Sequence, residues 1–240
     1  MSKCLTFSKH KAPQVLALPI GARFQTRRFI TFNTIPPTLA AEWQLFPEEC
    51  FPEAGFFLFM REQGSPMWYS VRCRYRPGDV CHVGVPHWRM RDTDGAISIW
   101  DEWSTIERWV DGRNEAVLQD PSTFLASCRR YMAGRFMPGW AATSWARILS
   151  ATPQRLQDCT EQDAVAELVE FSAHGAPGGG PGWRDYGSGN FVRTCALGSY
   201  RSMLNAVHGR DVWAQSPWVW RIEAQICEKP IAPAKEAKKP

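Results

Sequence analysis

Hydrophobic and polar residues alternate most regularly near the end of the chain. Trp218, Trp220, Ile222, Ala224 and Ile226 are apolar, and the residues between them are mostly polar. A period of two residues is typical of a β-strand with one buried face. Shorter apolar runs predict further strands over 80–85, after the turn 76–79, and over 145–152. We therefore expect a sheet whose last strand is half-buried.

Helical spacing appears in four other segments. Thr160–Asp163 resembles a capping box with Asp in place of Glu, and Ala164, Leu168 and Phe171 follow at helical intervals. A second helix is predicted from Leu197 to His208, where Gly209 ends it. The other two predicted helices are at 103–110, with an apolar stripe of Trp103, Ile106, Trp109 and Val110, and at 121–128, opened by Pro121-Ser122.

Short strands mixed irregularly with helices favour an α+β fold over a doubly wound sheet. The 240 residues can bury a core without disulfides or metal ions. We predict one domain over 1–228 and a disordered basic tail over 229–240, which is mostly Lys, Ala and Pro. The glycine- and proline-rich run 175–182 is predicted to be a loop.

Composition indicates in which cellular compartment the protein is expected. Hydrophobic residues make up 44% and charged residues 22%, and no run approaches the roughly 18 apolar residues of a membrane span. The first residues lack the apolar core and cleavage site of a signal peptide. We therefore expect a cytoplasmic protein with no membrane partner.

No sequence pattern indicates a metal or a cofactor. The eight cysteines are scattered without a C-x-x-C pair, which predicts buried free thiols. Cys73, Cys81, His82 and His87 lie close in sequence, but their spacing matches no common zinc template. Phosphate-loop, dinucleotide and G-x-S-x-G patterns are absent as well. We expect no metal and no cofactor.

The net charge is only +4, but acidic and basic residues are concentrated in different segments of the chain. Residues 92–120 hold eight acids against two arginines, whereas 71–91 and 129–147 are rich in arginine. Arg23, Arg27 and Arg28 form a third basic group. These groups either meet in a cleft suited to phosphate or nucleic acid, or form solvated faces paired with the acidic segment.

Four ordered segments carry a resemblance to a known family. They are Gly21–Arg28, Arg76–Val83, Met137–Ala141 with Arg147 and Arg155–Glu167, and Ser199–Asn205 with Ser216–Ile222. Together they resemble the phage and prophage branch of the ASCH domain family, whose fold is a small PUA-like β-barrel. Residues 31–70 and 92–130 have no counterpart and are expected to be insertions. The resemblance implies a pocket for a nucleic acid or a modified nucleoside.

In the branch of this family that resembles acetylcytidine amidohydrolases, a Lys, a Thr and a Glu hydrolyse an acetyl group. The matching positions are Arg23, Thr26 and Glu167, so the lysine is replaced. A guanidinium stays protonated near neutral pH and cannot act as a base or an amine nucleophile. A second departure lies at 84–88, where the family usually has R-E-T-W; there His82 or His87 is an alternative acid or base.

Each candidate residue also has a purely structural interpretation. The segment Gln25–Arg28 is alternatively a turn whose arginines cap carbonyl groups. Trp140, near Arg135 and Arg147, is either a stacking platform for a base or a core residue. Glu167 borders the apolar stripe of its helix, so its carboxylate either reaches a pocket or faces solvent.

Three hypotheses follow. The first is a phage-derived protein that binds RNA rather than DNA, or a modified nucleotide. Phosphate would contact Arg23, Arg27, Arg28 and Arg147, and a base would contact Thr26 and Trp140. The second is a hydrolase of an acylated nucleoside or of RNA, with Glu167 as general base, Thr26 as nucleophile or water-positioning group and Arg23 at the lysine position.

The third hypothesis is that the acidic insertion, through aromatics such as Trp103 and Trp109, binds a host protein. A phage-derived protein would act in the cytoplasm of its bacterial host.

Overall fold

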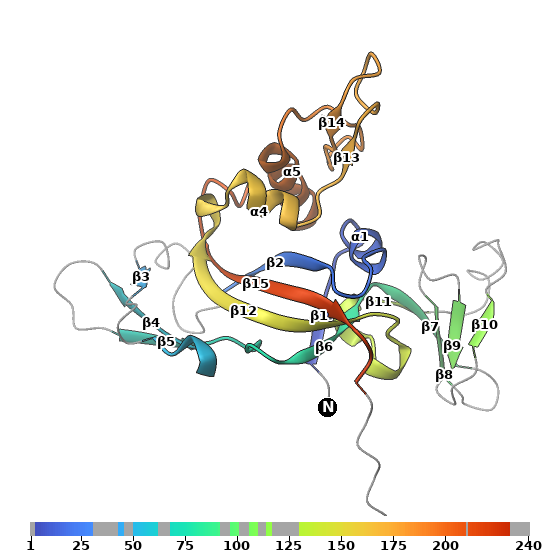
Figure 1. The fold of residues 1–240 in the computed structure, drawn as a ribbon, viewed down its shortest axis with the longest axis horizontal. Coiled ribbons are helices and arrows are strands. Elements are labelled where there is room, and N and C mark those ends of the chain that lie inside the picture. The colour runs from blue at the N-terminus through green and yellow to red at the C-terminus, as the bar shows by residue number, and fades with distance from the viewer. Residues whose placement is uncertain are drawn as a thin grey trace, which may run out of the picture.

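The computed structural model describes residues 3–30, 43–45, 50–61, 68–91, 97–100, 106–109, 114–116, 130–209 and 211–230. Its centre is a five-stranded sheet in the order β1 (Lys3–Thr6), β6 (Val80–Gly84), β12 (Trp145–Arg155), β15 (Trp218–Cys227) and β2 (Arg23–Phe29). β1 runs parallel to β6, and the other neighbours are antiparallel. Figure 1 shows this curved sheet in the middle of the molecule.

The strand predictions near the chain end and at 145–152 are confirmed. β15 keeps its period of two, with Ile222, Ala224 and Ile226 buried and the residues between them partly exposed. Val219 is buried as well, because helices cover the face of the sheet opposite to that of Trp218 and Trp220. The segment 25–28 is a strand and not a turn, since it pairs with Trp220–Glu223 of β15.

Two small sheets flank the central one (Figure 1). One contains β3 (Trp43–Leu45), β4 (Phe56–Arg61) and β5 (Trp68–Arg72), preceded by the short 3₁₀ turn η2 (Pro52–Ala54). The other, in the order β10-β9-β8-β7-β11, consists of β10 (Asn114–Ala116), β9 (Ile106–Trp109), β8 (Ile97–Trp100), β7 (His87–Arg91) and β11 (Arg130–Met132). The predicted insertions 31–70 and 92–130 supply most of these strands.

The predicted helix at 103–110 is wrong where the structure describes it. Ile106–Trp109 is β9, whose Arg108 and Trp109 pair with β8 and whose Ile106–Arg108 pair with β10. The spacing of Ile106 and Trp109 is compatible with either element over so few residues, and pairing with strands distant in sequence decides between them. The helix predicted at 121–128 lies outside the described residues.

In the part of the chain that the structure describes, three α-helices lie beside the central sheet: α1 (Ala12–Leu16), α4 (Glu161–Ala166) and α5 (Ala196–His208). The capping box that opens α4 is confirmed, because Thr160 Oγ1 accepts from the amide of Asp163 and Asp163 accepts from that of Thr160. The helix is shorter than predicted. It ends at Ala166, Glu167 is the C-cap residue, and Leu168 follows with φ 61°.

Phe171, predicted to lie in the α4 helix, belongs to the β13 (Phe171–Ser172) and β14 (Gly182–Trp183) hairpin that encloses the glycine-rich loop. The α5 prediction is confirmed, with Gly209 in the left-handed conformation after its last residue. Short 3₁₀ turns at η3 (Gly134–Phe136), η4 (Gly139–Ala141) and η5 (Leu156–Asp158) complete the described elements.

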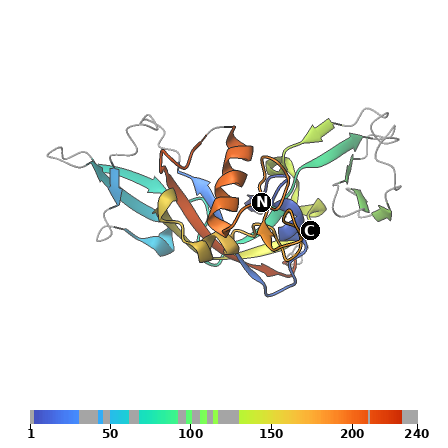
Figure 2. The same cartoon turned by 90° about the horizontal axis from the view of Figure 1, so that it is seen from above.

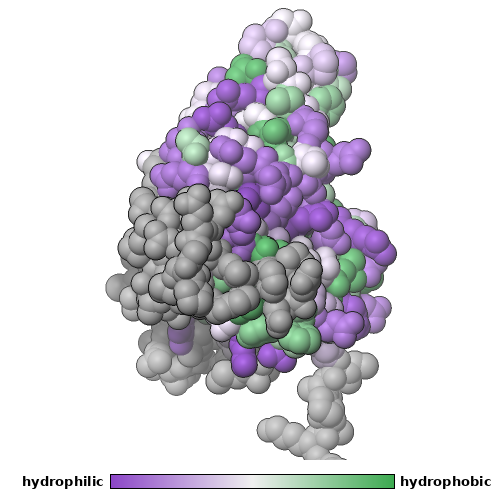
Figure 3. All heavy atoms as spheres, turned by 90° about the vertical axis from the view of Figure 1, so that its left-hand side faces the viewer, coloured by the Kyte–Doolittle hydropathy of each residue, from purple (hydrophilic) through white to green (hydrophobic). Residues whose placement is uncertain are grey.

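The buried side chains form two clusters, one on each face of the central sheet. One includes Phe24, Ile222 and residues of the small β3–β5 sheet, whose Phe57 and Phe59 contact Trp220 and Trp218 with ring centroids 5.0 Å apart. The other joins the sheet to α4 and α5. Figure 2 shows these two helices in front of the central strands. Seen from the side, polar residues dominate the helical layer and apolar ones are scattered among them (Figure 3).

The mixed α+β class is confirmed. β1 and β2 each pair with only one strand of the central sheet, so the described strands form no closed barrel. None of the described helices is long and apolar enough to cross a membrane.

Candidate functional site

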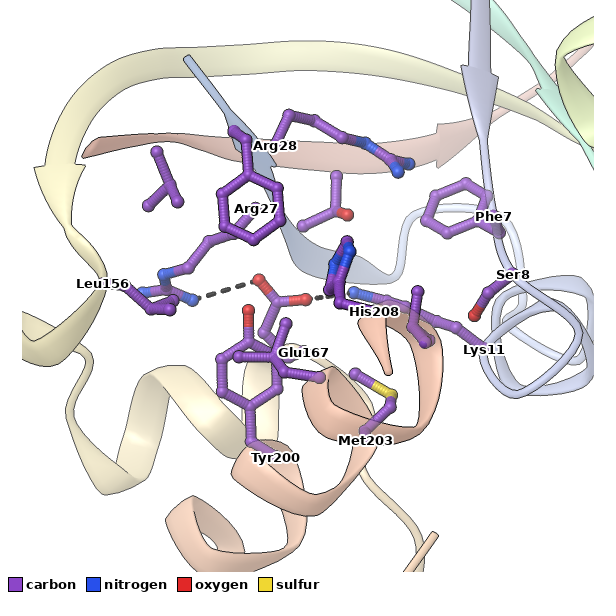
Figure 4. A pocket seen from close by; sticks show the side chains of 15 residues that line it. Phe7, Ser8, Lys11, Arg27, Arg28, Leu156, Glu167, Tyr200, Met203 and His208 are labelled. Atoms are coloured by element: carbon purple, nitrogen blue, oxygen red, sulfur yellow. Dashed lines mark hydrogen bonds and ion pairs between the residues drawn. The ribbon is translucent and has the colours of Figure 1, made fainter. Parts of the chain in front are cut away.

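A pocket of about 150 Å³ opens where β2 meets the helical layer and the segment before α1. β2 is an outer strand that pairs with β15 on one side only, and the pocket lies along its free side. Its walls come from four parts of the chain: the N-terminal segment (Phe7, Ser8, Lys11), β2 (Thr26, Arg27, Arg28, Phe29), Leu156 with Glu167 beside α4, and α5 with β15 (Tyr200, Met203, Leu204, Val207, His208, Val219). In Figure 4, Arg27 and Lys11 approach Glu167 from opposite sides, and Arg28 extends toward Phe7.

Glu167 is the only acidic residue in the pocket wall, and it is 2% exposed. Lys11 Nζ forms an ion pair with Oε2, and Arg27 Nη1 donates to Oε1 at 3.0 Å. The carboxylate follows the last residue of α4, where the negative end of the helix disfavours an acid. Its charge is therefore balanced by the two cations and not by the helix.

Lys11 lies directly before α1, whose first turn contains Pro13. Its Nζ also donates to the backbone carbonyl of Gln25 at 2.6 Å, which satisfies an acceptor on the free side of β2. Burial lowers the pKa of Lys11 from 10.5 to about 8, although the contact with Glu167 acts in the opposite direction. This amine can therefore gain and lose a proton close to neutral pH.

Arg27 fixes Glu167 from the other side. Its Nη2 lies 3.1 Å from Oε1 of Gln154 and 3.3 Å from Oδ2 of Asp163, and its guanidinium lies 5.9 Å from the Tyr200 ring centroid. Burial alone would lower the pKa of Arg27, but the surrounding acidic groups, led by Glu167, raise it. Arg27 therefore remains charged and holds the carboxylate in place.

Thr26 and Arg28 come from the face of β2 opposite to that of Arg27, so the pocket extends around the edge of the strand. Thr26 is 3% exposed and lines the pocket. Arg28 is half-buried, and its guanidinium lies 5.4 Å from the centroid of the Phe7 ring. Burial lowers the pKa of Arg28.

An aromatic pair forms part of the wall nearest to solvent. Phe29 is 37% exposed, and its ring meets that of His208 edge to face with centroids 4.7 Å apart. Val207 lies beside them and is also exposed. An exposed aromatic ring beside cationic groups suits stacking with a planar ligand.

The structure brings together only some of the residues that the sequence singled out. Thr26, Arg27, Arg28 and Glu167 line the pocket. Arg23, Trp140 and Arg147 are exposed and lie outside its wall. Arg23 begins β2, where it pairs in register with Gln225, six residues before Phe29 at the pocket end. The predicted arginine cleft is therefore built from Arg27 and Arg28 alone among these residues.

His82 and His87 also lie away from the pocket. His82 is buried with Nε2 2.9 Å from the carbonyl oxygen of Met137, and His87 Nδ1 lies 3.0 Å from that of Val85. Both hydrogen bonds agree with the structural interpretation of these histidines. Within the part of the chain that the structure describes, no cluster of three His, Cys, Asp or Glu residues could hold a metal ion.

Sequence reasoning missed two residues to which the pocket gives a role, Lys11 and Phe29. Lys11 lies 156 positions from its partner Glu167, and its neighbours in sequence form no motif. Pro13 marks a helix start, which places Lys11 at a helix N-terminus but does not indicate what its amine contacts.

Comparisons with known family models, curated proteins and solved structures returned no match to this chain. The function is therefore inferred from the residues of the pocket.

Proposed function

We propose that this protein is a hydrolase that removes a small acyl group from an acylated nucleoside. The observation that carries the proposal is the buried ion pair of Lys11 and Glu167 beside Thr26 in one pocket wall. The resemblance to the ASCH family implies a Lys, a Thr and a Glu for this reaction. Lys11, rather than Arg23, would supply the amine, and a PUA-like relationship of the sheet is part of the same proposal.

The chemistry assigns a role to each of the three groups. A water molecule attacks the acyl carbon and gives its proton to Glu167, while Thr26 hydrogen-bonds the acyl oxygen or the water. The bond between the acyl carbon and the nitrogen then breaks. Lys11 gives a proton to the departing nitrogen and recovers one from Glu167, so the products are a carboxylic acid and a free amine.

The lowered pKa of Lys11 supports the role of proton donor. An amine with a pKa of about 8 is mostly protonated at neutral pH and releases its proton more readily than an ordinary lysine. The contact with Glu167 provides the path for returning the proton. Arg27 stays charged and orients Glu167, so it acts as a positioning residue.

The size of the pocket favours a small acyl group. At about 150 Å³ it is smaller than the roughly 300–1,000 Å³ typical of sites that enclose a whole drug-sized ligand. An acetyl group fits within it, whereas the base and sugar would remain near the opening. Phe29 and His208 are the side chains there that a base would contact.

The test is hydrolysis of acetylcytidine by the purified protein and by two variants of the pocket. Glu167→Gln removes the base and should lower kcat by about 10² to 10⁴-fold while leaving substrate binding nearly intact. Thr26→Val removes only a hydroxyl and should lower kcat with little effect on folding. Glu228→Gln, at an exposed position, is the matched control and should retain full activity.

Lysine variants separate the roles of Lys11 and its neighbours. Lys11→Met should abolish turnover, and Lys9→Met, two residues away and exposed, should not. Circular dichroism of each variant checks that the fold is retained. Full activity of Glu167→Gln or of Lys11→Met would contradict the proposal.

A second candidate function is binding of RNA or of a modified nucleotide without turnover. It is favoured by the charge of the pocket wall, in which Lys11, Arg27 and Arg28 outnumber the single Glu167. Binding of single-stranded RNA measured at two salt concentrations tests it, because phosphate contacts weaken steeply with salt. Salt-dependent binding together with no product from acetylcytidine would favour this candidate.

A further inference from the structure

The two neighbouring arginines of the pocket differ in their partners. Arg27 contacts Glu167, Asp163 and Gln154. Arg28 forms no ion pair with any residue that the structure describes, and its buried Nε and Nη2 have no hydrogen-bond partner there. Its guanidinium lies 5.4 Å from the centroid of the Phe7 ring, and Tyr75 and Glu167 act on it only through their charges. One of the three cations in the pocket wall is therefore not neutralised by a contacting acid.

Burying Nε and Nη2 of a charged side chain without hydrogen-bond partners is costly for a folded protein. The contact with Phe7 offsets part of this cost, because a cation is attracted to the face of an aromatic ring. It does not provide acceptors for the in-plane N–H groups. Nε and Nη2 lie on one edge of the guanidinium, and this edge can donate two parallel hydrogen bonds to a carboxylate or a phosphate.

The surroundings of Arg28 also favour an anion. Lys11 and Arg27 line the same pocket, and Glu167 is already held by both of them. In Figure 4 the guanidinium of Arg28 points toward Phe7, on the side of the pocket where Lys11 enters. An anion bound here would lie close to, but not on, the carboxylate of Glu167.

We propose that Arg28 binds a phosphate group of the substrate, so that the substrate is an acylated nucleotide rather than a free nucleoside. This inference rests on the proposed hydrolase function and specifies its substrate class. Nε and Nη2 are closed off from solvent in the structure. We therefore expect the guanidinium to rotate toward the pocket when the phosphate enters, exchanging part of its contact with Phe7 for two charged hydrogen bonds.

The experiment measures binding by calorimetry, with cytidine, cytidine monophosphate, inorganic phosphate and acetate as probes. The wild-type protein should bind the monophosphate at least about tenfold more tightly than cytidine, as expected for charge-assisted hydrogen bonds. Arg28→Met should remove this difference. Arg28→Lys keeps the positive charge but lacks the planar edge, so it should retain only part of the difference in affinity between the monophosphate and cytidine. Arg23→Met, on the same strand but exposed, is the matched control and should behave as wild type.

Equal affinity of the wild-type protein for cytidine and its monophosphate would overturn the proposal, and this comparison does not depend on any variant folding. An undiminished preference in Arg28→Met would overturn it too. If acetate binds as tightly as phosphate and only Arg28→Met loses both, Arg28 belongs to the acyl site, and the assignment to phosphate is wrong.

The same titrations on Glu167→Gln measure phosphate binding in a variant that should not hydrolyse the substrate. They therefore test the phosphate site separately from the proposed reaction. If the protein prefers the monophosphate but hydrolyses neither acetylcytidine nor its phosphorylated form, the hydrolase proposal is wrong and the phosphate site is supported. If both substrates are hydrolysed with equal kcat/KM, the hydrolase proposal is supported and the phosphate site is contradicted.

Discussion

The two ends of β2 carry the same residue type in opposite environments. Arg23 at the first end is exposed, whereas Arg27 at the other end has a side chain that is 1% exposed and contacts two acids. The difference comes from what covers the strand. α4 and α5 pack over its second half, where Arg27 lies against Tyr200 and Phe29 against His208, and the segment before α1 brings Lys11 to its free side. Arginines of one basic sequence group can therefore be exposed or part of a site. Which of the two occurs depends on whether elements distant in sequence cover them.

The strongest test of this comparison exchanges each arginine for an apolar residue of similar length. Arg27→Met leaves Asp163 and Glu167 with one cation fewer in a buried site, so we expect a loss of about 3–5 kcal/mol in the free energy of unfolding. Arg23→Met should leave the unfolding midpoint unchanged. Urea titrations followed by circular dichroism measure both.

Lys11→Met in the Arg27→Met background adds a check on the cluster. If the two residues balance the same carboxylate, the double variant should depart from the sum of the two single effects. Strict additivity, or equal stability of Arg27→Met and wild type, would contradict the view that the second end of β2 is organised around Glu167.

The next largest effect concerns the pH dependence of turnover. Lys11 must be protonated to act as the proton donor, and its pKa is lowered by burial to about 8. The value of kcat should therefore be level below pH 8 and fall about tenfold per pH unit above it. Lys11→Arg keeps the positive charge but cannot release its proton, so it should lower kcat strongly, and the residual activity should show no decline above pH 8.

Unfolding does not explain such a decline in the range from pH 7 to 9. A lysine with a lowered pKa binds fewer protons in the folded than in the unfolded chain between about pH 8 and 10.5, so its contribution to stability rises with pH there. Burial raises the pKa of Cys81 and Cys159 to about 12, so their contribution is lost only above pH 9. A flat profile through pH 8 would remove Lys11 as the proton donor.

The elements of the fold that local patterns determine were predictable from the sequence. The alternation in β15, the capping box of Thr160 and Asp163, and the stop at Gly209 all involve residues near one another in the chain. The segment 106–109 was predicted wrongly because its few residues suit a helix or a strand, and pairing with distant strands selects the strand. α4 is also shorter than predicted, because Leu168 leaves the helical conformation with φ 61°.

The pocket was predictable only in part, for the same reason. Thr26, Arg27, Arg28 and Glu167 lie in segments that carry recognisable motifs, and they line one wall. Lys11 and Phe29 have no such motif. Lys11 joins the site because α1 lies beside the free side of β2, and an amine reaches both a backbone carbonyl and Glu167 from there. Topology, and not spacing, assembles these residues.

Aromatic residues extend the comparison beyond charge. Phe29 ends β2 at the pocket opening, whereas Trp140 lies in η4, outside the pocket wall. Phe29→Ala should raise KM about 5- to 100-fold, the range expected from loss of base stacking, with a smaller change in kcat. Trp140→Ala should leave both unchanged. The opposite result would return the stacking role to Trp140.

The smallest effect tests how firmly α4 holds the second end of β2 in place. Thr160 is the N-cap of α4 and Glu167 is its C-cap, so Thr160→Ala should cost about 1 kcal/mol of stability without changing any residue of the pocket wall. Because the carboxylate would be less well oriented, kcat should fall by a few-fold while KM changes little. Thr143→Ala, at an exposed position outside any helix, should alter neither quantity. Lower stability with unchanged kcat would mean that Lys11 and Arg27 alone orient Glu167, and that the cap serves only the helix.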